Sequence, residues 1–283
     1  MRVGVLDVGS NTIRLLVADV RGGAVVPVDK GRVRLSLGEE IELHGSLSAT
    51  SIRAAAKAVK KLRGVAAEHG VDDVDVFLTA PGRQAANADE LLDALDGAGA
   101  RVLTTEEEGT LAYRGAIATC DVALPSVVAV CDVGGASTEI AVGTPGADPH
   151  WIRSVDIGSV RLTARADSLA LARQEARAAL ADVVPPPVEA GLCVGGTARA
   201  ARRLVGPWLG KAELDEALHL ADSLDARDLT RRFGVDRSRA RILAGGIVIL
   251  AEVQSRLGVP LHVCDGGIRE GAALAAARLS RAA

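Results

Sequence analysis

Short apolar runs that end in glycine turns are the clearest pattern along the chain. Residues 3–6 are apolar and end at Asp7-Val8-Gly9-Ser10-Asn11-Thr12, and a second apolar run covers residues 13–20. Apolar runs joined by a short polar turn with glycine are typical of two paired strands. The first twenty residues therefore predict a strand, a polar glycine turn and a second strand.

The same pattern returns in the middle of the chain. Residues 127–131 are apolar, end at Asp132-Val133-Gly134-Gly135-Ala136-Ser137-Thr138, and lead into a run at 139–142. Asp132 follows Asp7 by 125 positions. A repeated unit at this distance predicts two similar domains from one duplicated design.

Helical and extended patterns alternate around these two units. Further strands are predicted at 74–78, 102–103, 151–155, 192–194 and 261–264. Helices are predicted at 48–69, 83–95, 106–118, 169–181, 198–204, 211–220, 237–257 and 268–280. The mixture indicates α/β layers, and residues 119–125 give the best boundary. We therefore predict an N-terminal domain over 1–120 and a C-terminal domain over 121–283.

Composition narrows the possible functions. Of the 283 residues, 48% are hydrophobic and only 2% aromatic, so the cores must consist of Ala, Val, Leu and Ile. The net charge is −3 and no basic stripe is visible, which argues against a nucleic-acid binder. No signal-peptide pattern and no membrane-length apolar run occur, so we expect a cytoplasmic protein. The four cysteines show no Cys/His metal spacing, and three of them are expected in the core.

The two matching turns suit a phosphate-rich ligand. Glycine lets backbone N–H groups approach phosphate oxygens. Asp7 and Asp132 open the turns, and a carboxylate beside phosphate requires a cation between them, which predicts Mg²⁺. Ordinary hairpin turns remain the alternative. Turns at 194–197 and 265–267 precede helices and are either anion sites or tight strand–helix connections.

Seven segments in order resemble the exopolyphosphatase / guanosine pentaphosphate phosphohydrolase (Ppx/GppA) family. The resemblance spans nearly the whole chain and begins with the opening signature at 6–15. It continues through 79–87, 107–115, 132–139, 158–163, 195–197 and 264–271. The family belongs to the actin, sugar-kinase and heat-shock ATPase superfamily. The resemblance therefore implies two duplicated actin-like (RNase H-like) domains of α/β class with a cleft between them.

The resemblance also implies roles for particular residues. Glu108 corresponds to the general base, and Asp7, Asp132 and Glu139 correspond to the Mg²⁺ ligands. The implied phosphate-binding residues lie on the glycine turns, the second strand and the segment at 79–87: Gly9, Ser10, Asn11, Thr12, Arg14, Arg83, Asn87, Gly134, Gly135, Ala136, Ser137, Thr138, Gly195, Gly196 and Thr197. Independently, a glutamate on the first turn of a helix is also favoured by the helix dipole alone.

The implied function is release of terminal orthophosphate from inorganic polyphosphate by a water that Glu108 activates. Thr105, Gly109 and Ala136 depart from the family pattern around the base and the second turn. The chain resembles a short form without the helical C-terminal domain of longer members, so we expect a preference for short polyphosphate. Hydrolysis of guanosine pentaphosphate (pppGpp), a kinase or ATPase activity, and a non-catalytic sensor remain alternatives. A homodimer is a further expectation from the family.

Overall fold

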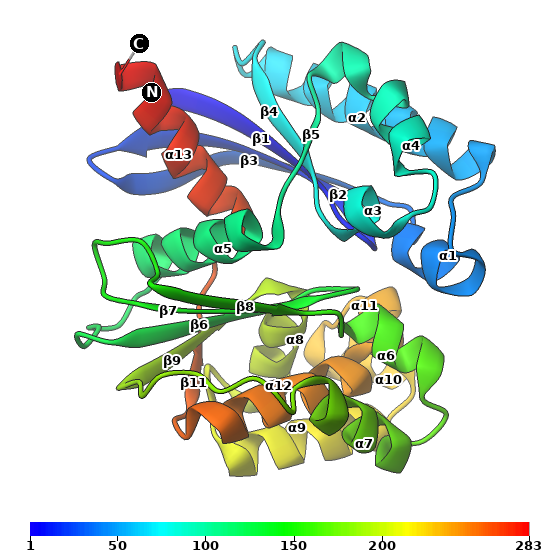
Figure 1. Cartoon of the computed structure of the whole chain (residues 1–283), viewed down its shortest axis with the longest axis vertical. Helices are drawn as coiled ribbons and strands as arrows, with labels where there is room; N and C mark the ends of the chain where they lie inside the picture. The colour runs from blue at the N-terminus through cyan, green and yellow to red at the C-terminus, as the bar shows by residue number, and fades with distance from the viewer. Residues whose placement is uncertain (283) are drawn as a thin grey trace.

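Two mixed sheets form the frame of the computed structural model, which describes residues 1–282 and the side chains of residues 1–278 (Figure 1). The first sheet contains β1 (Arg2–Val8), β2 (Thr12–Arg21), β3 (Ala24–Arg34), β4 (Val74–Leu78) and β5 (Arg101–Val102). Their order is β3-β2-β1-β4-β5. β1, β2 and β3 pair antiparallel, whereas β4 and β5 run parallel to β1.

The second sheet repeats this arrangement. It contains β6 (Val128–Val133), β7 (Thr138–Gly143), β8 (Trp151–Val155), β9 (Ala190–Val194), β10 (Trp208–Leu209) and β11 (Leu261–Val263). The order β8-β7-β6-β9-β11 has the same strand directions as the first sheet, and β10 adds one antiparallel strand at its edge. The duplicated design predicted from the two glycine turns is therefore present in the strand topology.

Helices cover the outer face of each sheet and fill the space between them (Figure 1). The helices before the second sheet are α1 (Leu37–His44), α2 (Ala49–Glu68), α3 (Ala80–Gln84), α4 (Ala88–Ala94), the 3₁₀ turn Asp96–Ala98 and α5 (Thr105–Thr119). Those that follow are α6 (Ser159–Arg165), α7 (Leu169–Ala179), α8 (Gly195–Val205), α9 (Lys211–Ser223), α10 (Ala226–Phe233), α11 (Arg237–Arg241), α12 (Leu243–Leu257) and α13 (Ile268–Ala282). Among the described residues, none of these helices combines the length and apolar character needed to cross a bilayer.

Of the two helices between the sheets, α5 packs mainly on the second sheet and α13 packs on the first. α5 buries Ala112, Tyr113 and Ala116 against β6, β7 and β9 of the second sheet. α13 returns to the first sheet, where Ala273 and Leu274 pack on β1 and β2. The predicted ranges 1–120 and 121–283 thus separate α5 and α13 from the sheet on which each packs most, although Leu111 of α5 also reaches the core of the first sheet. Apolar faces decide this placement, and a boundary drawn along the chain cannot show it.

Several elements escaped prediction: β3, β10, α1, α6 and α10. β3 contains Pro27 and many exposed polar residues, which a central strand would not tolerate. It lies at the edge of the sheet, where proline costs no ladder hydrogen bond. The helix predicted at 83–95 is two helices, α3 and α4. The chain between them is held by the Asn87 side chain, which bonds the backbone of Leu47.

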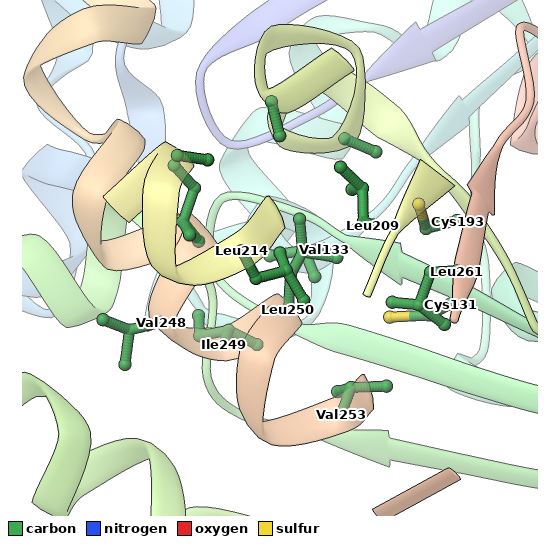
Figure 2. Close-up of a cluster of buried hydrophobic side chains, with 14 of the residues drawn as sticks. Cys131, Val133, Cys193, Leu209, Leu214, Val248, Ile249, Leu250, Val253 and Leu261 are labelled. Carbon is green, nitrogen blue, oxygen red and sulfur yellow. The ribbon is translucent and has the colours of Figure 1, made fainter. Parts of the chain in front are cut away.

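The largest core lies between the second sheet and its helices. Figure 2 shows Val248, Ile249, Leu250 and Val253 of α12 beside side chains from β6, β9 and β11. Cys131, Cys193 and Cys264 are at most 2% exposed, which confirms that three cysteines are core residues. Apolar side chains without aromatics pack closely enough here to fill the space between helix and sheet.

Candidate active site

A cavity of about 120 Å³ lies between the two sheets, where the matching turns meet. The β1–β2 turn and the β6–β7 turn close in the same way. The Gly9 N–H donates to the Thr12 carbonyl at 3.3 Å, and the Gly134 N–H donates to the Ser137 carbonyl at 3.0 Å. The two turns approach so closely that a Cβ at Gly135 would lie 3.0 Å from the Ser10 Cβ.

Most residues implied by the resemblance line this cavity. They come from both sheets and from the start of α5: Asp7, Gly9, Ser10, Asn11, Thr12, Arg14, Glu108, Asp132, Gly134, Gly135, Ala136, Ser137, Glu139, Gly195 and Gly196. Gly195 has φ +91°, and a Cβ there would collide with the Asp132 carboxylate. Glycine is therefore required where β9 passes into α8.

Four predicted residues do not line the cavity. Asn87 uses its side chain on the Leu47 backbone, at 2.9 Å in both directions. Thr138 donates to the Ile157 carbonyl at 2.6 Å, and Thr197 is fully buried. Arg83 donates to the Glu108 carboxylate and, at 2.7 Å, to the Leu103 carbonyl. Arg83 therefore contacts the predicted base, and the other three support the fold around the site.

The segment at 158–163 supports the second turn from behind. The backbone N–H groups of Ser159 and Val160 donate to the carbonyls of Gly134 and Gly135 at 2.9 and 2.8 Å. A Cβ at Gly158 would collide with the backbone of Gly135. This segment, part of the resemblance, therefore shapes the turn without lining the cavity.

Five carboxylates line the cavity: Asp7, Glu108, Asp132, Glu139 and Glu270. Burial raises the pKa of Asp7 to about 6, against attraction from Arg14 and Arg269. Burial also raises the pKa of Glu108 to about 7, opposed by its bond to Arg83. The pKa values of Asp132 and Glu139 are raised as well, first by burial. Several buried acids at close range disfavour one another's charged forms, so the site carries negative charge that needs compensation.

The carboxylates fit a hard divalent cation. The Asp7 Oδ1 atom is buried without a hydrogen-bond partner, and such atoms are costly unless paired or coordinated. Asp7, Asp132 and Glu139 offer only oxygen ligands, which is the donor set that Mg²⁺ prefers. One Glu139 oxygen accepts from Ser154 at 2.8 Å, which fixes the orientation of its carboxylate.

The sequence alone did not predict most of the positively charged residues that line the cavity. Arg199 from α8, Arg239 from α11 and Arg269 from α13 also line it, together with Glu270. Burial and neighbouring arginines lower the pKa values of Arg199 and Arg239 to about 10, so both stay charged at neutral pH. The glycine pair before α13 pointed to Arg269, whereas nothing local distinguished Arg239.

A larger basic hollow of about 360 Å³ continues from the cavity, with which it shares Asn11, Thr12 and Gly196. It lies between the edge strand β3 and helices α8 and α11. Its basic lining residues are Arg14, Lys30, Arg32, Arg34, Arg199, Arg203, Arg239 and Arg269. Asp236 is the one acid among the described residues that line it. Local positive charge thus exists although the chain as a whole carries a net charge of −3.

Comparisons with known proteins agree with this geometry. The chain is 25% identical to exopolyphosphatase 1 of Mycobacterium leprae over 300 residues, which covers 96% of this chain and 88% of that protein. It is 34% identical to exopolyphosphatase 2 of Mycobacterium tuberculosis over 176 residues, or 58% of this chain and 54% of that protein.

Solved structures share the fold. A Ppx/GppA family member from Aquifex aeolicus superposes with a TM-score of 0.83 at 24% identity, covering 99% of this chain and 98% of that one. An exopolyphosphatase from Cytophaga hutchinsonii gives 0.82 at 19% identity, covering 96% of each chain. The predicted fold of two duplicated actin-like domains is thereby confirmed. The model of the Ppx/GppA phosphatase family matches residues 16–203, more than half of the sequence, and the chain therefore belongs to this family.

Proposed function

We propose that the chain is an exopolyphosphatase that releases terminal orthophosphate from inorganic polyphosphate. The observation that carries this proposal is the position of Glu108, a buried carboxylate that faces two glycine turns and a group of arginines in one cavity. Phosphoanhydride hydrolysis needs a positioned water and charge neutralisation more than covalent chemistry. The exopolyphosphatases among the relatives support the same substrate class.

Glu108 acts as the general base in this proposal. A pKa of about 7 suits a carboxylate that must accept a proton near neutral pH. The water oxygen attacks the terminal phosphorus, its proton passes to Glu108, and the bridging P–O bond breaks to leave a chain one phosphate shorter. Arg83 holds the carboxylate in place, and Arg14, Arg199, Arg239 and Arg269 neutralise phosphate oxygens.

Asp7, Asp132 and Glu139 would hold Mg²⁺ in the same cavity. When bound, the ion would offset the charge of the phosphate oxygens and of these carboxylates. The unpartnered Asp7 oxygen supports this assignment. The protein's own part is to bring together three carboxylates from two sheets, at the end of β1 in the first sheet and on the paired strands β6 and β7 of the second.

The basic hollow favours inorganic polyphosphate over guanosine pentaphosphate. A phosphate chain that leaves the cavity meets Lys30, Arg32 and Arg34 on β3. No aromatic side chain is among the described residues that line the hollow, so a guanine base would find no stacking partner there. Positive charge without an aromatic surface suits a polyanion that has no base.

The first test is phosphate release from short polyphosphate with Mg²⁺. We expect Glu108→Gln to lower kcat at least about 100-fold, the order of a lost general base, while polyphosphate binding persists. Glu106→Gln is the matched control, because Glu106 is exposed on the same helical turn. An equal fall in kcat in both variants would mean that Glu108 is not the general base.

The same assay separates the alternatives. Faster release from pppGpp than from polyphosphate at equal concentration would assign the nucleotide as substrate. Tight binding of polyphosphate without any release by the wild type would show a sensor. Residues that depart from the family pattern would then be the ones to change. Gly109 is a poor choice among them, because any side chain there would place a Cβ 2.7 Å from Ile152 Cγ2.

A further inference from the structure

A second cluster of reactive side chains lies where the chain passes between the domains. After α5 the chain enters the second domain through Cys120 and Asp121, and after β11 it returns through Cys264 toward α13. Ligand atoms of Cys120, Asp121 and His262 all lie within 4.8 Å of one another. Asp121 and His262 are 141 positions apart in sequence, so only the two neighbouring crossings bring them together.

His262 is the fixed part of this cluster. It is 4% exposed and its ring lies against Trp208, with ring centroids 4.5 Å apart. Nε2 lies 2.8 Å from the Asp121 Oδ1 atom, whereas Nδ1 is buried without any hydrogen-bond partner. One ring nitrogen thus faces a carboxylate and the other lacks a partner. An ion shared with Asp121 would bind Nε2, the ring nitrogen that faces this carboxylate, in place of the proton between them.

Cys264 adds a second thiol to the same place. It lies two positions after His262, is 2% exposed, and its Sγ is 3.9 Å from the His262 carbonyl oxygen. Burial raises the pKa of its thiol, and the neighbouring Cys120 raises it further. Two thiols, an imidazole and a carboxylate are ligands that zinc takes, whereas Mg²⁺ avoids sulfur.

The size and access of the cluster also suit zinc. Ligand atoms of one tetrahedral zinc ion lie about 3.5 Å apart, given typical zinc–ligand lengths. The three atoms here lie within 4.8 Å of one another, so they need to move closer by at most about 1.3 Å to reach that spacing. Asp121 is 81% exposed on its side chain, so an ion reaches the cluster from solvent without unfolding of the core.

We propose that Cys120, Asp121 and His262, joined by Cys264, form a zinc site at the crossings between the two domains. The ion links the end of α5 to the end of β11, the two places where the chain passes from one domain to the other. The Thr119 hydroxyl, which accepts from the Gly266 N–H at 3.0 Å, already joins these crossings. Zinc would therefore join the two chain crossings, at a place separate from the carboxylates that face the glycine turns.

Cobalt substitution tests the site directly. The purified reduced protein is freed of metal and titrated with Co²⁺, whose bonds to thiolate give a strong near-ultraviolet charge-transfer absorption. We expect one equivalent of Co²⁺ to produce this absorption, Zn²⁺ to abolish it, and excess Mg²⁺ to leave it unchanged. Cys120→Ala should lower the absorption by the share of this thiolate, and the double variant Cys120→Ala/Cys264→Ala should remove it. Cys131→Ala, which removes a thiol buried in the largest core, should retain it.

A variant at the surface separates binding from folding. Asp121→Asn alters an exposed side chain, so the fold should survive, and we expect zinc affinity to fall about 10–100-fold. Co²⁺ bound without charge-transfer absorption, or with the same absorption in Cys120→Ala, would place the ion elsewhere and overturn the proposal. A Cys120–Cys264 disulfide, found by mass spectrometry in protein that no longer binds zinc after reduction, would overturn it as well.

Discussion

At the scale of single residues, burial and neighbouring charges act in opposite directions on the pKa values of the carboxylates in the site. Glu108 is desolvated by burial and held by Arg83, and the two effects act on its pKa in opposite directions. Burial raises the pKa of Asp7, the charges of Asp132 and Glu270 raise it further, and Arg14 and Arg269 lower it. A cation or a phosphate changes this balance, so the ligand-free site should respond to both pH and metal.

The stability of the metal-free protein should therefore fall as pH rises. Burial raises the pKa of Asp7 from 3.8 to about 6 and that of Glu108 from 4.5 to about 7. The folded state thus binds these protons more tightly than the unfolded state, and the stabilisation present near pH 4 is lost as pH rises through 6–7. We expect Mg²⁺ to raise the Tm on the order of 5 °C at pH 8 and far less at pH 5.

Thermal melts across this pH range, with Mg²⁺ or with chelator, measure the effect. Asp7→Asn removes one raised carboxyl and should flatten the pH dependence of the chelated protein. A Mg²⁺ effect of equal size at pH 5 and pH 8 would argue that these carboxylates do not bind the ion.

At the scale of elements, the crossing of α5 and α13 positions the site. Glu108 stands on the first turn of α5, and Arg269 and Glu270 stand on the first turn of α13. The helices touch through glycines: a Cβ at Gly115 would collide with the Gly267 carbonyl, and one at Gly271 with the Leu111 carbonyl. Backbones in direct contact leave little freedom, so this crossing fixes the base relative to the arginine.

Gly115→Ala should consequently destabilise the protein severely. The added methyl meets backbone atoms that cannot rotate away, and we expect a loss of about 3 kcal/mol or more in the free energy of unfolding. Gly64→Ala is the control, since Gly64 is exposed in the middle of α2 with nothing within 4 Å of a Cβ. Alanine there should stabilise by up to about 1 kcal/mol through helix propensity.

Urea unfolding of the two variants measures this contrast. Similar midpoints for Gly115→Ala and Gly64→Ala would mean that the helices can separate at no cost. The position of Glu108 would then have to be fixed by Arg83 and the capping of α5 alone.

At the scale of the whole molecule, polar contacts close the domains over the cavity. Glu42 of α1 accepts from Arg161 at 2.9 Å and from Arg165 at 2.5 Å, both on α6. On the other side, Asp236 accepts from Arg34 of β3 at 2.7 Å. The basic hollow lies beside this second contact and exists only because β3 and α11 come from different domains. The predicted homodimer stays a prediction. The described apolar residues of α12 and α13 pack mostly within the chain.

The hollow gives a prediction about chain length. Lys30 is exposed at its edge, so Lys30→Gln should raise KM about 3–10-fold for polyphosphate long enough to leave the cavity, the order of one phosphate contact. KM for tripolyphosphate should change little. Lys60→Gln removes the same charge from the exposed face of α2 and should affect neither substrate.

Phosphate release at two salt concentrations completes the test. The contribution of Lys30 should shrink as salt rises, because an exposed charge is screened. Equal turnover of short and very long chains by the wild type would contradict the expected short-chain preference. An equal KM change for both chain lengths would remove the hollow from the path of the substrate.

The sequence by itself determined the features that depend on neighbouring residues. Both turns follow an apolar run with an aspartate, a glycine and small polar residues, and both close with the same backbone hydrogen bond, so the two glycine turns and the duplication were predictable from 7–12 and 132–138. Glu108 was predictable because its helix follows a recognisable pattern. Most of the residues implied for the site line the cavity for this reason.

Only the tertiary structure decided which distant residues meet. Arg199 and Arg239 lie on two helices and look like ordinary solvated arginines in sequence, yet the packing of those helices places both in one cavity with Arg269. The edge strand β3, the exchange of α5 and α13 between sheets, and the meeting of Cys120 with His262 are likewise absent from any local pattern. These placements share one physical reason. Burial of apolar faces decides which helices and strands pack together, and the polar residues on those elements come together as a consequence.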